Sequence, residues 1–84
     1  MNKTPESQEI NKRFIRSFDE LRYRGLVKTK TEFCKSVGIF NTSNFERMKK
    51  SGEPSLTNII LLHKNFGVSV EWIMLGAGDF FDSN

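Results

Sequence analysis

Apolar residues recur every three or four positions along the first third of the chain, which is the spacing of one face of an α-helix. Four residues share this stripe: Ile10, Phe14, Phe18 and Leu21. Gly25 follows it, and glycine readily takes the left-handed conformation in which many helices end. The pattern therefore predicts a first helix from about Glu6 to Arg24.

A second, shorter helix is predicted after Thr29, where the sequence Thr-Lys-Thr-Glu has the pattern of a capping box. In such a box the Thr29 hydroxyl accepts a hydrogen bond from the amide three residues on, and the Glu32 carboxylate reaches back to the amide of Thr29. The residues expected to face inward are Phe33, Cys34 and Val37. Gly38 is expected to end this helix.

Polar residues dominate the third predicted helix, which covers about residues 42–50. Asn41 or Thr42 begins it, since either side chain can cap a first turn. Phe45 and Met48 are its apolar positions, and residues three apart share one face of a helix. The remaining side chains lie off that face, so we expect them to point away from the core.

Two further helices follow a turn at residues 51–54. Ser55 caps the fourth and Gly67 closes it; Ser69 begins a short fifth helix, which Gly76 ends. The apolar positions of the fourth helix are Leu56, Ile59, Ile60, Leu62 and Phe66. Five helices joined by short loops predict an all-α fold.

The composition fits one small helical domain. A chain of 84 residues is near the lower limit for a self-sufficient core, and eight Phe, one Trp and one Tyr supply the large apolar surfaces that such a core needs. Cys34 and His63 are single residues of their kinds, so we expect no disulfide within the chain, no metal site and a reducing cytoplasm. No apolar run approaches the ~20 residues that span a bilayer, and the polar start predicts no signal peptide.

The charges are unevenly distributed along the chain. Residues 1–21 are neutral overall, residues 22–50 carry eight basic and two acidic side chains, and residues 51–84 have a net charge of −3. A basic middle beside an acidic end is typical of a protein that presents one face to a polyanion.

Four stretches of the chain, in this order, resemble the XRE-type family of phage and bacterial repressors, which includes Cro-like proteins. The stretches are KTKTEFCKSVGI at 28–39, SNFERM at 43–48, PSLTNII at 54–60 and GVSVEWI at 67–73. The resemblance spans Leu26 to Leu75. It implies a five-helix lambda-repressor-like domain over residues 1–84, with a helix-turn-helix at about 29–50.

Individual positions within these stretches have physical reasons. Cys34 is small and apolar where the second helix has to approach the third, and Gly38 occupies the turn, where glycine tolerates a positive φ. The interval from Gly38 to Phe45 is one residue longer than is usual in the family. We interpret either Phe40 or Asn41 as an insertion in the turn, which tilts the third helix.

The resemblance also implies which residues contact DNA. The base-reading positions of the family fall on Thr42, Ser43, Asn44, Glu46 and Arg47. With the third helix in the major groove, Arg47 pairs with a guanine, Asn44 with an adenine and Glu46 with a cytosine amino group. The expected phosphate contacts are Lys28, Thr29, Lys30, Lys35, Lys49 and Lys50.

Members of this family usually bind paired half-sites as homodimers. We expect the pairing surface in a C-terminal segment, residues 70–84, with Trp72, Phe80 and Phe81 at its centre. The two adjacent phenylalanines either fold back onto the core or form an exposed adhesive patch.

The favoured function is therefore sequence-specific binding of double-stranded DNA by a transcriptional regulator of the repressor type. We expect it to be either complete in this chain or the first part of a longer protein. The alternative is a protein-interaction module, such as an antitoxin or adaptor subunit, that uses the acidic and aromatic C-terminal end. An enzyme is the least favoured class, because no nucleophile–base set, glycine-rich phosphate loop or metal cluster is present in the sequence. We expect no cofactor, no small-molecule substrate and no membrane association.

Overall fold

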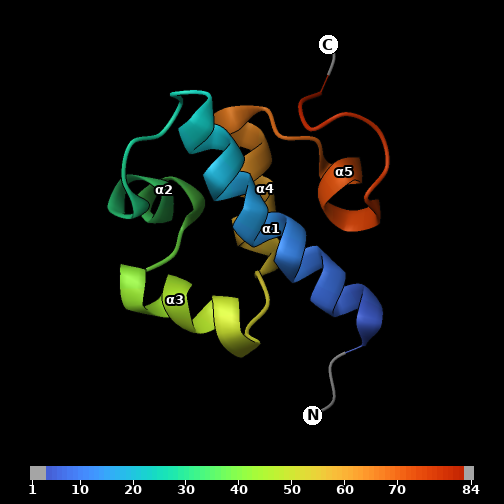
Figure 1. Cartoon of the computed structure of the whole chain (residues 1–84), viewed down its shortest axis with the longest axis horizontal. Coiled ribbons are helices and arrows are strands. Elements are labelled where there is room, and N and C mark those ends of the chain that lie inside the picture. Colours follow the sequence, from blue (N-terminus) through green and yellow to red (C-terminus); the bar gives the residue numbers. More distant parts are fainter. Residues whose placement is uncertain (1–3, 83–84) are drawn as a thin grey trace.

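Each predicted helix forms close to its predicted bounds. A computed structural model describes residues 4–82 of the chain, and its helices within that range are α1 (Pro5–Tyr23), α2 (Lys30–Val37), α3 (Thr42–Ser51), α4 (Leu56–Phe66) and α5 (Val70–Leu75) (Figure 1). Apart from one isolated bridge between Val68 and Phe81, the described residues form no β-structure. The prediction of an all-α fold is confirmed for this part of the chain.

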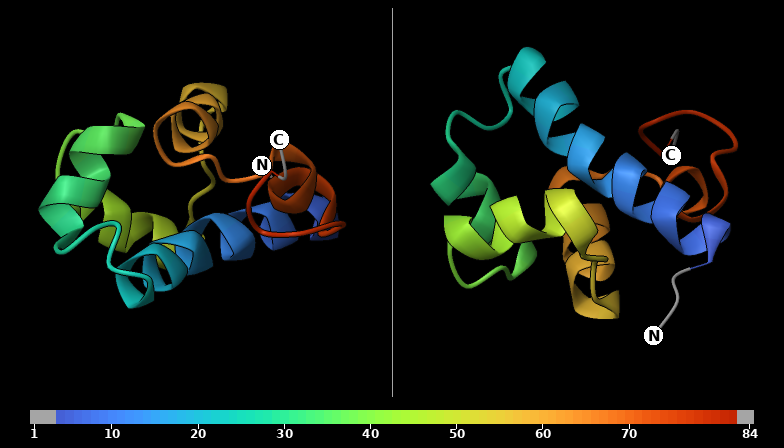
Figure 2. Two further views of the ribbon diagram at one scale, coloured as in Figure 1. Left: turned by 90° about the horizontal axis from the view of Figure 1, so that it is seen from above. Right: turned by 60° about the horizontal axis from the view of Figure 1, so that its bottom comes forward.

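The helices are arranged around α1, which crosses the whole molecule (Figure 1). α4 packs against α2 and α5, while α1 contacts α3 and α5. Both views in Figure 2 place α2 and α3 together at one end and α5 with the C-terminal segment at the other. α2 and α3 are thus separated from α5 and the segment after it, whereas α4 packs against α2.

Short polar side chains start the helices, as the sequence predicts. The side chain of Asn41, not that of Thr42, caps α3: its Oδ1 atom accepts from the Asn44 amide at 2.9 Å. Ser55 and Ser69 cap α4 and α5. These bonds satisfy amides that have no partner inside their own helix.

Only one of the two hydrogen bonds predicted for the capping box at α2 forms. The Thr29 hydroxyl accepts from the Glu32 amide at 3.1 Å, but the Glu32 carboxylate accepts from the amide of Lys28 at 2.7 Å instead of that of Thr29. The carboxylate therefore satisfies a donor one residue farther from the helix. A reciprocal box forms instead at α4, between Ser55 and Asn58.

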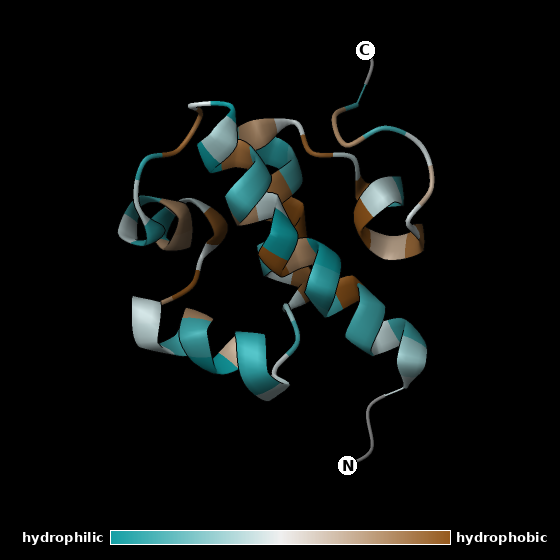
Figure 3. Cartoon of the chain, viewed as in Figure 1, coloured by the Kyte–Doolittle hydropathy of each residue, from teal (hydrophilic) through white to brown (hydrophobic). Residues whose placement is uncertain are grey.

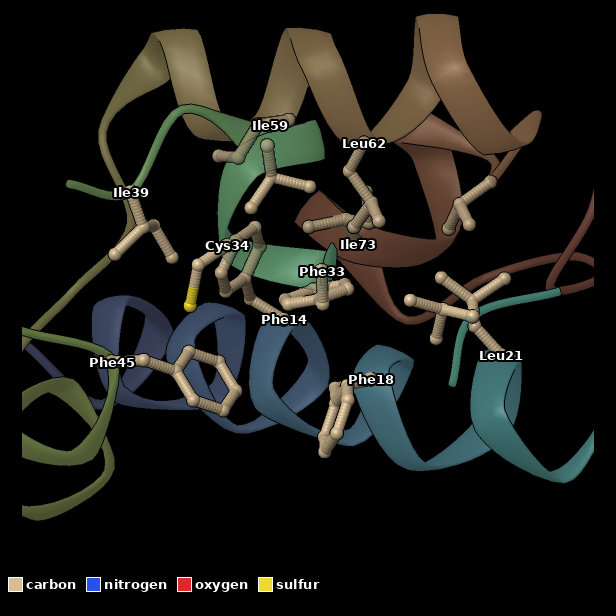
Figure 4. Packing of buried hydrophobic residues seen from close by; sticks show 13 residues of the cluster. Phe14, Phe18, Leu21, Phe33, Cys34, Ile39, Phe45, Ile59, Leu62 and Ile73 are labelled. Carbon is tan, nitrogen blue, oxygen red and sulfur yellow. The ribbon is translucent and has the colours of Figure 1, made fainter. Parts of the chain in front are cut away.

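Aromatic rings from four helices meet at the centre of the core. The ring of Phe33 in α2 lies 5.3 Å from that of Phe18 and 5.9 Å from that of Phe14, both in α1. It also lies 5.5 Å from Phe45 in α3 and 6.3 Å from Phe66 in α4. Figure 4 shows buried side chains filling the space between α1 and α4. These rings connect α2 to every neighbour that sets its position.

A buried asparagine adds a polar link to this core. The side-chain amide of Asn58 donates to the carbonyl oxygen of Val37 at 2.8 Å, while its Oδ1 atom accepts from the Ser55 amide. It therefore satisfies a carbonyl at the end of α2 and caps α4 at the same time. The sequence pattern gave no indication of this bond.

The C-terminal segment folds back onto the helices. The Ser69 amide donates to the Phe80 carbonyl at 2.7 Å, and the Phe80 ring lies 4.8 Å from both the Trp72 and the Phe81 ring. The guanidinium of Arg24 lies 4.9 Å from the centre of the Phe81 ring. Of the two alternatives for Phe80 and Phe81, packing against the core is therefore the one the structure shows.

None of the helices between residues 4 and 82 is both long enough and apolar enough to cross a membrane.

Phe33→Ala should lower the free energy of unfolding by about 3–5 kcal/mol, because it removes the ring that joins four helices and leaves a cavity. Phe40→Ala is the matched control: Phe40 is 91% exposed, so its loss should change stability by less than about 0.5 kcal/mol. Urea unfolding followed by circular dichroism measures both. Equal effects of the two substitutions would contradict this description of the core.

Candidate nucleic-acid interface

α3 presents its polar side to solvent because its apolar side is fixed from behind. Phe45 is fully buried, and its ring makes an edge-to-face contact with that of Phe18 at 5.6 Å. Met48 is half-buried, and its carbonyl oxygen accepts a hydrogen bond of 2.9 Å from the Asn11 side chain of α1. One apolar anchor and one polar bond thus hold α3 against α1. Figure 3 shows that the remainder of α3 is largely hydrophilic.

The turn between α2 and α3 consists of a glycine and three further residues. Gly38 has φ of +78°, and its amide and that of Ile39 both donate to the Cys34 carbonyl. Ile39 is buried, whereas Phe40 points to solvent. The turn therefore has an apolar anchor of its own, and Phe40 adds length to it without joining the core.

Four of the five predicted base-contacting residues gather at one place on this outer side. A shallow surface hollow of about 400 Å³ is lined by Thr42, Ser43, Glu46, Arg47 and Lys50, and we call it the α3 hollow. Ser43, Arg47 and Lys50 are exposed, while Thr42 and Glu46 are half-buried. Asn44 lies on the same helix but does not line the hollow.

An ion-pair network connects α3 to α2 at the α3 hollow. The Glu46 carboxylate forms a hydrogen-bonded ion pair with Lys30, the first residue of α2, and lies 3.5 Å from the ammonium group of Lys49. The bond to Lys30 holds the pKa of Glu46 below its ordinary value and raises that of Lys30. Glu46 is therefore ionised at neutral pH, and it already has two cationic neighbours.

The predicted phosphate contacts do not all lie together. Lys30 and Lys49 meet at Glu46, and Lys50 lines the α3 hollow. Lys28 and Lys35 are exposed but line no part of the hollow. The predicted contact at Thr29 uses a hydroxyl that is already engaged in capping α2.

Arg22 is a basic residue at the end of α1 to which the sequence assigned no DNA contact. The bond to Glu46 dominates the upward shift of the Lys30 pKa, and the charge of Arg22 acts against that shift. Arg22 is therefore within electrostatic reach of Lys30. The sequence placed it only within the basic middle, and no local pattern relates it to Lys30.

The predicted pairing surface is partly covered by the chain itself. Trp72, Phe80 and Phe81 are all half-buried, because they pack on one another. Residues 83 and 84 of the predicted segment 70–84 lie outside the described residues. Exposed large apolar side chains lie both inside this segment, where Leu75 is 74% exposed, and outside it, where Leu56 is 71% exposed.

The single cysteine and histidine have structural surroundings. Cys34 is buried in the core, and burial raises the pKa of its thiol, so it is not an activated nucleophile. The Nδ1 atom of His63 lies 3.0 Å from the Val68 carbonyl oxygen and 3.2 Å from the Asp82 carboxylate, a contact the sequence did not indicate. Residues 4–82 contain no group of three side chains suited to hold a metal ion.

Gly38→Ala should destabilise the protein by more than Gly67→Ala. The φ angles of the two glycines are +78° and +75°, a region where an L-residue costs about 1–2 kcal/mol. A Cβ atom on Gly38 would also lie 3.0 Å from the Leu61 side chain, whereas one on Gly67 would meet nothing within 4 Å. Thermal unfolding of the two variants gives the difference. Equal losses would show that the turn between α2 and α3 is not closely packed on α4.

No protein-family model, curated protein or solved structure matches this chain significantly, so the comparisons assign it no family.

Proposed function

We propose that the chain is a sequence-specific DNA-binding protein that regulates transcription, of the XRE-type repressor class. In this proposal α2, the turn at Gly38 and α3 form the helix-turn-helix of a lambda-repressor-like domain, and α3 enters the major groove. The observation that carries the proposal is the outer side of α3, where exposed Ser43, Arg47 and Lys50 stand on a helix that Phe45 anchors from behind.

The dimensions and chemistry of α3 suit a duplex. The major groove of B-DNA, about 12 Å wide, admits one α-helix, and side chains near the start of that helix reach the base edges. Arg47 offers the two parallel donors that pair with guanine, and Ser43 and Asn44 offer shorter polar groups in the first turn. Lys50 at the end of α3 is placed for a phosphate, which fixes orientation without reading sequence.

The distribution of charge supports the same orientation. α2 and α3 lie at one end of the molecule, and the acidic residues Glu71, Asp79 and Asp82 belong to α5 and the segment after it, at the other (Figure 2). A duplex bound at α3 therefore meets the basic end, while the acidic end stays away from the phosphates.

One domain of this size offers a small DNA interface, so we propose that two copies bind paired half-sites about one helical turn apart. Trp72, Phe80 and Phe81 remain the residues proposed for pairing. Their mutual packing leaves each ring partly exposed, and a contact with the second copy would use this exposed part. The proposed role would place the protein in the cytoplasm.

Selection of bound sequences from a random pool of duplexes tests the proposal. It predicts an enriched motif of two similar half-sites, and retention of mixed duplexes at low salt in a mobility-shift assay. Recovery of no motif, together with no retention at low salt, would overturn the proposal and favour the protein-interaction module.

Arg47→Ala should reduce affinity for the selected site by about 1–3 kcal/mol and relax discrimination at one base pair, because Arg47 is proposed to read a base edge. Lys12→Ala, an exposed lysine of α1, is the control of equal charge. Anisotropy titrations of a set of single-base site variants measure both effects. An equal loss on every duplex would show that Arg47 contacts only the backbone.

Lys50→Ala should weaken binding to all duplexes alike and reduce the slope of log K against log salt by about one, because one fewer phosphate is neutralised. Lys64→Ala, an exposed lysine of α4, should leave the slope unchanged. A slope that is also unchanged by Lys50→Ala would remove Lys50 from the phosphate contacts.

A further inference from the structure

Glu46 is the one acidic residue of α3, and it stands among cations. Its Oε2 atom accepts from the ammonium group of Lys30 and lies 3.5 Å from that of Lys49. Arg47 and Lys50 line the α3 hollow beside it. The carboxylate is thus at the centre of the surface that is proposed to meet DNA.

The ion pair between Lys30 and Glu46 lies at the surface, and this position makes it weak. The side chains of Lys30 and Glu46 remain 42% and 46% exposed, and exposed ion pairs contribute little to stability because water solvates both charges well. A competing anion with similar oxygen atoms can therefore replace the carboxylate at small cost. A DNA phosphate is such an anion, since lysine binds it as a point charge.

We propose that Glu46 occupies Lys30 and Lys49 in the free protein as an internal substitute for a DNA phosphate, and that a phosphate has to displace it when a duplex binds. This inference rests on the proposed function. Glu46 then limits the electrostatic attraction between the protein and DNA, an effect that we call the gate. This role replaces the contact with a cytosine that the family resemblance implies.

Such a gate lowers the affinity for every duplex, so stable binding depends more on contacts to base edges. Binding to arbitrary DNA depends almost entirely on lysine and arginine contacts to phosphates, whereas the cognate complex also has contacts to base edges. A carboxylate that occupies two lysines and repels phosphates weakens the contacts to phosphates in every complex. Only a duplex that gains base contacts through residues such as Arg47 recovers the loss.

Glu46 stays ionised near neutral pH, so small changes of pH do not alter the gate. The hydrogen bond to Lys30 holds the pKa of Glu46 below its ordinary value, so the carboxylate stays charged at neutral pH. The pair forms in the folded protein above the ordinary pKa of glutamate and is lost as the pH falls through the lowered value. A neutral side chain of the same shape therefore gives a cleaner test than a change of pH.

Glu46→Gln tests the gate, with Glu9→Gln as its matched control. Glu9 forms an exposed ion pair with Lys12 on α1 at 3.2 Å, so both substitutions remove one negative charge and break a Glu–Lys pair. The measurement is the affinity for a short random-sequence duplex as a function of salt, by fluorescence anisotropy. Circular dichroism of both variants checks that the helices are retained.

The gate predicts that Glu46→Gln binds random duplexes several-fold more tightly than the wild type and steepens the salt slope by about one to two, because two lysines become free for phosphates. Glu9→Gln should change neither quantity by a comparable amount. Adding Lys30→Ala to Glu46→Gln should bring the slope back by about one unit, since it removes one of the released cations.

Three results would overturn the inference. Equal behaviour of Glu46→Gln and Glu9→Gln would do so while leaving the proposed function intact. A loss of affinity confined to one base pair of the selected site would show instead that Glu46 reads a base. If the wild type and every variant fail to bind any duplex at low salt, the proposed function falls and the gate falls with it.

Discussion

Phe33 contacts aromatic rings from three other helices, and this packing sets the positions of α2 and α3. Without it α2 would touch α1, α3 and α4 only through smaller side chains, and a helix of eight residues has too few hydrogen bonds to persist by itself. The same cluster includes Phe45, so the packing that stabilises α2 also decides which side of α3 is hidden. The exposure of the polar side of α3 is thus a consequence of the core.

Three polar contacts further fix the positions of these helices relative to one another. Asn11 holds the end of α3 to α1, Asn58 holds the end of α2 to α4, and the pair of Lys30 with Glu46 joins α2 to α3. The first two are buried residues whose amides satisfy carbonyl groups, which favours one geometry over others. The third is about half exposed, and for that reason we propose for it a role in binding and not in folding.

The sequence predicted the helices well, because their signals are local. Helix starts at Thr29, Ser55 and Ser69 depend on hydrogen bonds within four residues, and the apolar spacing of Phe14 and Phe18 requires only one helical turn. Contacts between distant segments were largely missed. Nothing near Glu46 in the sequence indicates Lys30, and nothing near His63 indicates Asp82, since the fold alone brings these pairs together. Helical periodicity predicted the positions of the α3 side chains. It could not predict which residues of other helices they contact.

The proposal that the outer side of α3 binds DNA is tested by an amide chemical-shift titration of the protein with a short duplex at low salt. The largest shifts should lie in α3 and at the start of α2, around Lys30, and α5 should be little affected. Shifts confined to α5 and the segment after it, or no shifts at all, would contradict the proposal.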